Sequence, residues 1–272
     1  MFGHGHHHNP ASGGGYTSPA PPMGQHGPGE WTDDTSMAVA VARVVAEGHD
    51  LRDPAALDAV AAGFDEWFAG GPRDIGNQTR AVLSQRSPDA AGMTAAAAAL
   101  TGRTGGNGSL MRTAAVGLGY LDDTEQACAA AAVAVSRLTH VDERAEQACA
   151  LWSVAIRHAV LTGTFDGVRG YLTARPEEAR YWGPLLDQAE QGTPADFANN
   201  GWVVLALQTA WWAITHADDS GPEHLAAALE LCVRAGHDTD TTAAIAGGLL
   251  GARWGASAVP ARWRRGIGRA HV

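Results

Sequence analysis

Two short acidic motifs carry the residues of this chain that are best suited to metal chemistry. The first is Thr-Asp-Asp-Thr at 32–35, and the second is Asp-Thr-Asp-Thr-Thr at 238–242, near the other end of the sequence. Their carboxylate and hydroxyl oxygens are the hard ligands that Mg²⁺ and Ca²⁺ prefer in proteins. Each motif stands at the head of an apolar segment, and we expect folding to bring the two motifs together around metal.

Helix capping alone accounts poorly for this pattern. Asp and Thr commonly cap helices, so one such residue near Asp34 or Thr241 would be ordinary. Each motif has two acidic residues, which is more than helix capping requires. Carboxylates gathered where the dielectric constant is low repel one another by on the order of several kcal/mol, and cations must neutralise them there. The residue types therefore favour a metal centre built from both motifs.

A glycine-rich segment at 101–109 is a candidate for anion binding. Gly105, Gly106 and Gly108 would let backbone N–H groups approach a ligand closely, and a nest of amides can hold a pyrophosphate. A flexible linker has a similar composition, so composition alone leaves that alternative open. His140 lies at the junction of two predicted helices; a lone histidine is more often structural, but its position between elements makes it a further candidate.

The apolar periodicity predicts helices along most of the chain and almost no strands. The predicted helices cover approximately 35–47, 54–69, 123–138, 142–161, 197–215, 222–235 and 241–254. The abundance of alanine also favours an all-α bundle, because alanine has the highest helix propensity. The sequence therefore predicts a single helical domain in which both acidic motifs precede or open helices.

The helix predicted at 241–254 has an unusual line of small residues, Ala243, Gly247 and Gly251, with Ala244 and Gly248 beside it. Each glycine costs up to ~1 kcal/mol relative to alanine inside a helix, which indicates that another backbone packs very close to it. We expect this helix to be central and buried. Its first turn would then place Asp238 and Asp240 at the mouth of the bundle.

Composition excludes several classes of partner. The chain has 272 residues and a formal charge of −10, with 29 acidic and 19 basic residues, which argues against binding to nucleic acid or to anionic membranes. Cys128, Cys149 and Cys232 lie within apolar helical patterns, so we expect reduced core thiols. No apolar run approaches the ~18 residues of a membrane span. These features predict a soluble, cytoplasmic monomer.

Residues 1–28 differ from the remainder of the chain. Glycine, proline and histidine dominate them, and such a segment buries too little apolar surface to offset its ordering entropy. His4, His6, His7 and His8 could hold Ni²⁺ or Zn²⁺ in vitro, but a disordered leader or cloning remnant explains them better. We therefore expect a flexible leader at 1–28 and a helical domain at 29–272.

Four motifs, taken in order, resemble those of the ADP-ribosylglycohydrolase family. They are Gly-Glu-Trp-Thr-Asp-Asp-Thr-Ser-Met at 29–37, Gly-Asn-Gly-Ser-Leu-Met-Arg at 106–112, Leu-Thr-His at 138–140 and Asp-Thr-Asp-Thr at 238–241. The segments 74–77 and 201–212 are also similar to bacterial members. The resemblance implies a compact, orthogonal all-α bundle with two Mg²⁺ ions, or Mn²⁺ in some members. It also implies a hydrolase that releases ADP-ribose from a protein side chain or small molecule, with an arginine-type linkage favoured.

The resemblance also implies roles for individual residues. The metal ligands would be Thr32, Asp33, Asp34, Asp238, Asp240 and Thr241. Either Asp33 or Asp34 would activate the attacking water. The loop residues Gly106, Asn107, Gly108 and Ser109 would lie along the diphosphate, with Met111 nearby, and His140 would line the ribose side of the cleft. Asp74 and Gly76 match the family pattern more weakly and receive no role.

Two alternative functions remain open at this point. Family members usually begin with an apolar Gly/Ala-rich helix ahead of the first metal motif, and a polar segment stands there in this chain. A binding or structural homologue that holds ADP-ribose without turnover is therefore the second hypothesis. Asp238 to Thr242 also fits the D-x-D-x-T pattern of haloacid dehalogenase-type phosphatases. That family needs a β-strand before the first Asp, whereas the spacing of Leu225, Ala228 and Cys232 is helical.

Overall fold

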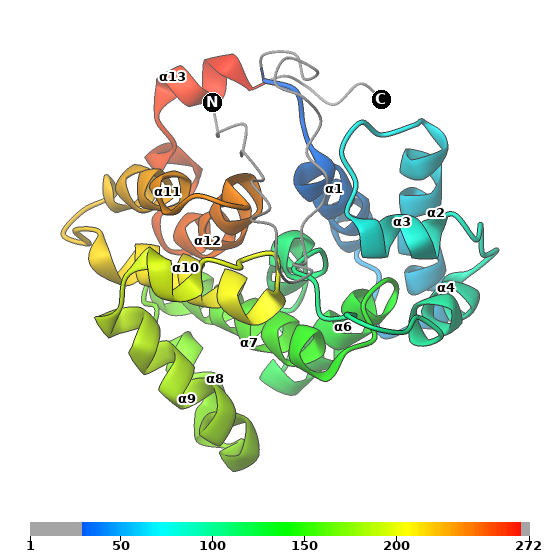
Figure 1. The fold of residues 1–272 in the computed structure, drawn as a ribbon, viewed down its shortest axis with the longest axis horizontal. Helices are drawn as coiled ribbons and strands as arrows, with labels where there is room; N and C mark the ends of the chain where they lie inside the picture. The colour runs from blue at the N-terminus through cyan, green and yellow to red at the C-terminus, as the bar shows by residue number, and fades with distance from the viewer. Residues whose placement is uncertain (1–28, 268–272) are drawn as a thin grey trace.

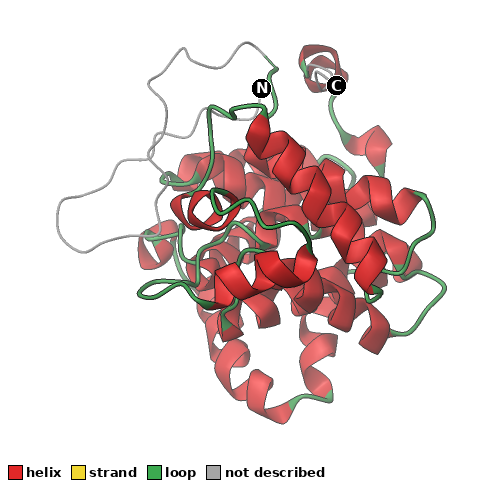
Figure 2. Ribbon diagram, turned by 90° about the vertical axis from the view of Figure 1, so that its right-hand side faces the viewer, coloured by secondary structure: helices red, strands yellow, loops and turns green. Residues whose placement is uncertain are grey.

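The computed structural model describes residues 29–267, and these residues are mainly helical. Within this range no strand is present (Figure 2), and the only β-type pairing is an isolated bridge between Gly106 and Trp202. The predicted all-α fold is confirmed. The predicted flexible leader at 1–28 lies outside the described residues.

Figure 1 shows the arrangement of the helices in chain order. The α-helices are α1 (Asp33–Ala46), α2 (Pro54–Ala69), α3 (Asn77–Leu83), α4 (Ala90–Ala98), α5 (Ala114–Gly119), α6 (Glu125–Arg137), α7 (Glu143–Thr162), α8 (Gly167–Thr173), α9 (Pro176–Gln191), α10 (Val203–His216), α11 (His224–Ala235), α12 (Thr239–Trp254) and α13 (Ala261–Gly266). The 3₁₀ helices are η1 (Leu110–Arg112), η2 (Pro194–Phe197) and η3 (Ala256–Ala258).

Helix α1 begins directly at the first acidic motif. Thr32 has an extended backbone, and its carbonyl accepts the first helical hydrogen bond, from the Ser36 N–H at 3.1 Å. The aspartates in the first turn are favoured there by the positive end of the helix dipole. Met37 and Val41 then form the buried face of the helix. The apolar stripe of α1 thus fixes where the motif stands relative to the core.

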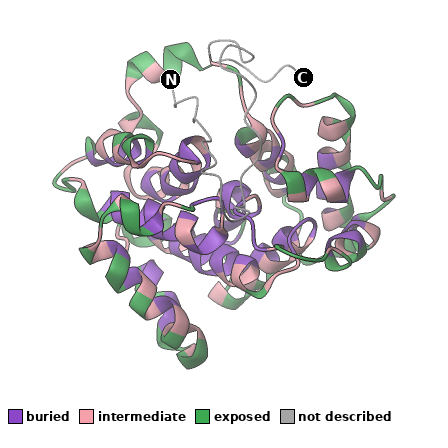
Figure 3. Ribbon diagram, in the orientation of Figure 1, coloured by how far each residue is buried: buried purple, intermediate pink, exposed green. Residues whose placement is uncertain are grey.

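The core is centred on α7 and α12, which the surrounding helices cover (Figure 3). Helix α7 is buried without interruption from Ala148 to Ile156. Helix α12 packs against α1, α7, α10 and α11, and the Trp152 indole N–H donates to the Ile245 carbonyl at 2.9 Å, joining α7 to α12. The predicted central position of α12 is confirmed.

The close packing expected at the small residues of α12 is found at Gly248 but not at Gly247 or Gly251. A Cβ added to Gly251 would meet no atom within 4 Å, and one added to Gly247 would meet only the Leu229 Cδ2 atom, at 3.6 Å. The close approach occurs instead at Gly248, where the added Cβ would lie 3.0 Å from the Ala114 Cβ of α5. Gly247 and Gly251 are half-exposed, whereas Ala243 is buried, so the close contact of α12 is made through Gly248.

Other differences concern helices with weak apolar patterns. Helix α10 begins at Val203, because residues 198–202 form an irregular connection after η2. Helices α8 and α9, which extend away from the other helices at the lower left of Figure 1, have no counterpart among the predicted helices. Helix α9 is amphipathic but rich in charge and carries Pro184 in its interior. The chain also continues past α12 into α13.

The three cysteines and the membrane test agree with the sequence expectations where the structure describes them. Cys128, Cys149 and Cys232 are all buried free thiols, which confirms that they are core residues. No single helix within 29–267 is long and apolar enough to cross a membrane. Helices α7 and α8 pass that test only as a pair, bent by 120°, and α7 is largely buried in the core.

Candidate functional site

The amino ends of α1 and α12 bring the two acidic motifs together. Asp33 and Asp34 occupy the first turn of α1, while Asp238 caps α12 and Asp240 lies in its first turn. The two helices are in contact. Asp34 and Asp238 are only 4% and 5% exposed, and the charge of Asp238 acts directly on Asp34. Motifs from opposite ends of the sequence thus form one acidic cluster, which we define as Asp33, Asp34, Asp238 and Asp240.

Burial and like charge raise the pKa of the α1 carboxyls. Burial, followed by the charge of Asp238, raises the pKa of Asp34 to about 7, although the Thr32 hydroxyl, which donates to Asp34 Oδ2 at 3.0 Å, lowers it. Burial raises the pKa of Asp33 well above its usual range, and the charges of Asp34 and Asp74 add to this effect. The cluster therefore needs protons or cations to offset its charge.

On the α12 side of the cluster, the pKa of Asp240 is raised for the same reasons. Burial raises the pKa of Asp240 well above its usual range, and the charges of Asp34 and Asp238 raise it further. A hydrogen bond between the carboxyl groups of Asp240 and Asp238 contributes to the same shift. Thr241, in the next position, is buried at 5% exposure. All the residues expected to ligate metal thus lie at these two helix ends.

Asp74 is a site residue to which the sequence gave no role. It stands in the connection before α3, and its charge raises the pKa values of both Asp33 and Asp34. The signal available in the sequence was its weak match to the family pattern at 74–77. A fifth carboxylate therefore acts on the cluster from a third segment of the chain.

The donor set suits a divalent cation in its chemistry. Hard oxygen donors dominate it, and two buried atoms, Asp34 Oδ1 and Thr239 Oγ1, have no hydrogen-bond partner. Within the described residues, no group of three carboxylate, imidazole or thiolate side chains already has the arrangement of a metal site. A bound cation would therefore have to draw the carboxylates of the cluster closer to one another.

The glycine-rich loop is attached directly to the acidic cluster. The Asn107 N–H donates to the Gly201 carbonyl at 3.0 Å, and the Val203 N–H donates to the Gly105 carbonyl at 2.9 Å. The Asn107 side-chain amide donates to Asp238 Oδ2 at 2.8 Å. Asn107 thus faces the cluster with its side chain, and its place beside a diphosphate stays a prediction.

The His140 ring packs against Gly106 and Gly108 of the same loop. A Cβ added to Gly108 would lie 3.0 Å from His140 Cε1, and one added to Gly106 would lie 3.4 Å from Nε2. The ring is buried, and its Nδ1 is 2.6 Å from the Thr139 hydroxyl. Burial and, secondarily, the charge of Arg112 hold the pKa of His140 well below its usual range. The imidazole that packs against the loop is therefore neutral.

The side chains of Ser109 and Met111 point away from solvent. The Ser109 hydroxyl is fully buried and accepts from the Ser136 hydroxyl at 2.9 Å, and Met111, in η1, is 6% exposed. The loop would consequently contact a ligand through the backbone around Gly106 and Gly108, with these side chains anchoring it to the core.

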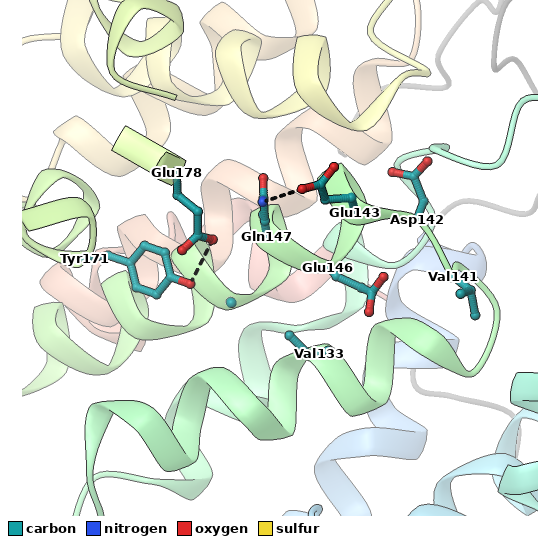
Figure 4. Close-up of a pocket in the computed structure, with 9 residues that line it drawn as sticks. Val133, Val141, Asp142, Glu143, Glu146, Gln147, Tyr171 and Glu178 are labelled. Carbon is teal, nitrogen blue, oxygen red and sulfur yellow. Dashed lines mark hydrogen bonds between the residues drawn. The ribbon is translucent and has the colours of Figure 1, made fainter. Parts of the chain in front are cut away.

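A separate cavity of about 350 Å³ lies among α6, α7, α8 and α9. Figure 4 shows four acidic side chains around it, of which Asp142 accepts from the Arg144 and Ala145 N–H groups. Glu146 pairs with Arg137 at 2.7 Å, Glu178 accepts from the Tyr171 hydroxyl, and Glu143 accepts from Gln147. The carboxylates of this pocket are therefore held by pairs and hydrogen bonds within the protein.

The phosphatase alternative is excluded by the element before Asp238. The D-x-D-x-T enzymes need a β-strand there, and the structure has α11 followed by a turn at Gly236 and His237. No strand occurs anywhere between residues 29 and 267. A parallel sheet that could present Asp238 at its edge is thus missing from the described fold.

Comparison with known proteins finds relatives that cover most of this chain. The chain is 27% identical over 245 residues to the ADP-ribosylarginine hydrolase Tri1 of Pseudomonas putida, with 86% of this chain and 62% of that relative covered. It therefore spans about three fifths of that relative's length. It is 29% identical to the ADP-ribosyl-[dinitrogen reductase] glycohydrolase of Rhodospirillum rubrum, covering 87% of this chain and 73% of the relative.

A solved structure and a family model extend the comparison to the fold. An ADP-ribosylglycohydrolase-related protein complex contains a chain that superposes with a TM-score of 0.64 at 26% identity, covering 89% of this chain and 77% of the other. The family model described as ADP-ribosylglycohydrolase matches residues 5–272. Because that match covers nearly the whole sequence and the acidic cluster stands within it, this chain belongs to the ADP-ribosylglycohydrolase family.

Proposed function

We propose that this protein is a metal-dependent hydrolase that releases ADP-ribose from a modified side chain or small molecule. The observation that carries the proposal is the buried acidic cluster formed where α1 meets α12. The family supports the class of reaction, and the name of the Pseudomonas putida relative favours an arginine linkage. The glycine-rich loop beside the cluster would receive the diphosphate.

In this proposal, Thr32, Asp33, Asp34, Asp238, Asp240 and Thr241 hold two Mg²⁺ ions, or Mn²⁺ ions. Bound there, divalent cations would supply Lewis acidity that lowers the pKa of a coordinated water. Asp33 or Asp34 orients the attacking water and accepts its proton. The Gly108 backbone amide would contact the diphosphate and keep the ribose in register with the cluster, since the Gly106 N–H donates to Gln78 Oε1 at 3.3 Å.

The bond changes follow from glycosidic chemistry. The bond between ribose C1′ and the guanidine nitrogen breaks through a transition state with oxocarbenium character, and the leaving nitrogen takes up the proton that the water gives to the carboxylate. The water oxygen forms the new bond to C1′. The products are ADP-ribose and the unmodified arginine side chain. Carboxylates near C1′ stabilise the developing positive charge, which the acidic cluster is suited to do.

Two substitutions at opposite halves of the cluster test this function. Asp33→Asn and Asp240→Asn should each abolish the release of ADP-ribose from ADP-ribosyl-arginine in the presence of Mg²⁺ or Mn²⁺. Asp122→Asn is a matched control, because Asp122 is an exposed aspartate outside the cluster. Full turnover in both cluster variants would contradict the proposal.

A binding measurement beside the hydrolysis assay separates the hydrolase from a homologue that only binds ADP-ribose. Calorimetry with ADP-ribose and Mg²⁺ should detect binding by the unmodified protein in either case. The hydrolysis assay uses ADP-ribosyl-arginine, ADP-ribosyl-serine and O-acetyl-ADP-ribose as substrates. If the protein binds ADP-ribose but releases it from none of these substrates, the protein is a binding homologue and not a hydrolase.

A further inference from the structure

A buried asparagine, Asn200, joins the glycine-rich loop to the second acidic motif. It lies in the irregular connection before α10 and is 1% exposed. Its Oδ1 accepts from the Asp238 N–H at 2.9 Å, and its Nδ2 donates to the Gly236 carbonyl at 3.1 Å. Its backbone carbonyl accepts from the Asn107 side chain at 3.0 Å. One residue thus contacts both sides of the candidate site.

The turn that Asn200 holds has an unusual backbone. Gly236 has a φ of 81°, and His237 has a φ of 62°, a region that residues with a side chain seldom adopt. Such conformations persist only where surrounding contacts determine them. The Asn200 amide brackets the turn, because it binds the carbonyl at its start and the N–H at its end. These two bonds therefore fix the direction in which Asp238 leaves the turn.

Asn107 fixes the carboxylate of Asp238 in the same way that Asn200 fixes its backbone. The Asn107 amide nitrogen has two hydrogens, and both are used: one bond goes to the Asn200 carbonyl and the other to Asp238 Oδ2. Flipping the amide would turn its oxygen towards the carboxylate, which is unfavourable. The pair of asparagines therefore determines both the position and the rotation of the Asp238 carboxylate.

We propose that Asn200 is a positioning residue that holds Asp238 for divalent-cation binding and couples the cation site to the glycine-rich loop. This inference rests on the proposed metal centre. Residues that orient metal ligands typically contribute about 10–100-fold to metal affinity. Since the Asn107 bond links the loop to Asp238, a ligand that orders the loop should also tighten cation binding, and the reverse holds by thermodynamic linkage.

The test measures Mn²⁺ affinity directly, from the paramagnetic resonance signal of free Mn²⁺. Asn200→Ala should weaken Mn²⁺ binding by about tenfold or more. Asn199→Ala is a matched control, because Asn199 is the adjacent asparagine and its side chain is exposed; it should leave the affinity unchanged. Asn200→Ser provides a second variant that fills more of the space, and we expect the same loss of affinity.

A second readout separates positioning from general destabilisation. ADP-ribose should tighten Mn²⁺ binding to the unmodified protein by about fivefold or more, and this factor should shrink towards one in Asn200→Ser and in Asn107→Ala. Helical circular dichroism without metal identifies the variants that remain folded. Equal Mn²⁺ affinity in the unmodified protein and folded Asn200 variants would overturn the positioning role. No Mn²⁺ binding by the unmodified protein would instead overturn the metal centre itself.

Discussion

At the scale of single residues, Asp34 illustrates how burial and neighbouring groups set the chemistry of the cluster. Its carboxyl is 4% exposed, and burial is the largest cause of its raised pKa. Asp238 adds to that shift through its charge, whereas the Thr32 hydroxyl opposes it by donating a hydrogen bond. The α1 motif thus carries both a destabilised carboxylate and a group that orients it.

Gly108→Ala should disturb the geometry of the glycine-rich loop, and so lower kcat/KM, more than it disturbs the overall fold. The new Cβ would lie 3.0 Å from His140 Cε1, so the loop or the ring must shift. Because Asn107 sits in the same loop and contacts Asp238, we expect at least about a tenfold loss of kcat/KM, in line with the effect of groups that orient metal ligands. Gly170→Ala is the control, since its added Cβ meets nothing within 4 Å. Unchanged kcat/KM in Gly108→Ala would contradict a role for the loop geometry.

His140 should make stability depend on pH. Burial, with a secondary contribution from Arg112, holds its folded-state pKa below the usual 6.5, so the unfolded chain binds the proton first. The stabilisation from neutral His140 is complete above pH 6.5 and is lost as the pH falls below that value. Urea unfolding of the unmodified protein and His140→Gln between pH 8 and 5 should show a stability difference that narrows with acid. A difference independent of pH would refute the buried neutral ring.

The sequence identified the acidic motifs because residue type and spacing carry that information. It identified neither the charge effect of Asp74 nor the contacts of Asn200. Asp74 acts on Asp33 through space from the connection before α3. Asn200 acts through bonds to Gly236 and Asp238, which lie in a later connection of the chain. Contacts of this kind exist only after the helices pack, so no local pattern encodes them.

At the scale of elements, α12 is the helix that positions the site. It contacts α1, α7, α10 and α11, so its first turn is fixed relative to most of the core. The small residues of α12 predicted this central place correctly. They did not tell which glycine makes the close approach, which is Gly248 and neither Gly247 nor Gly251, because glycine frequency does not identify the neighbour.

Substitutions of glycine by alanine distinguish open helix surface from close packing. Gly251→Ala should raise the free energy of unfolding by about 0.5–1 kcal/mol, since its added Cβ meets nothing and alanine favours the helix. Gly117→Ala should lower it by about 1–3 kcal/mol, because the Cβ would lie 2.7 Å from the Ser153 carbonyl oxygen of α7. Guanidinium unfolding measures both values, and a destabilised Gly251→Ala would restore the contact line that the sequence suggested.

The elements that sequence reasoning missed have weak or interrupted patterns. The face of α9 that enters the core is short, with Trp182 and Leu186 buried among charged neighbours. The start of α10 was placed too early because Phe197 is buried in η2 and resembles a helical apolar position. In both cases the tertiary neighbours, rather than the local period, decide where the helix begins.

At the scale of the whole molecule, the chain is a helical protein with a charge of −10. Part of its negative charge is gathered in the cluster at the ends of α1 and α12, where Asp34 and Asp238 are buried and Asp33 and Asp240 are half-buried. Folding therefore works against electrostatic repulsion at this one place. A cation that binds only the folded state should relieve that repulsion and stabilise the molecule.

Divalent cations should consequently raise the melting temperature. At a Mg²⁺ concentration one hundred times the dissociation constant, the stabilisation is about 2.7 kcal/mol, which corresponds to a rise of roughly 5–11 °C for a domain of this size. Asp240→Asn removes one proposed ligand and should reduce the rise, while Asp122→Asn should leave it unchanged. A melting temperature that does not respond to Mg²⁺ or Mn²⁺ would argue against the metal centre.

The most direct test of the account is the release of ADP-ribose from ADP-ribosyl-arginine by chelator-treated protein, followed by chromatography. The account predicts no release before addition of cation, release after addition of Mg²⁺ or Mn²⁺, and none from Asp33→Asn or Asp240→Asn under the same conditions. Release that continues with excess chelator, or that survives both substitutions, would contradict it.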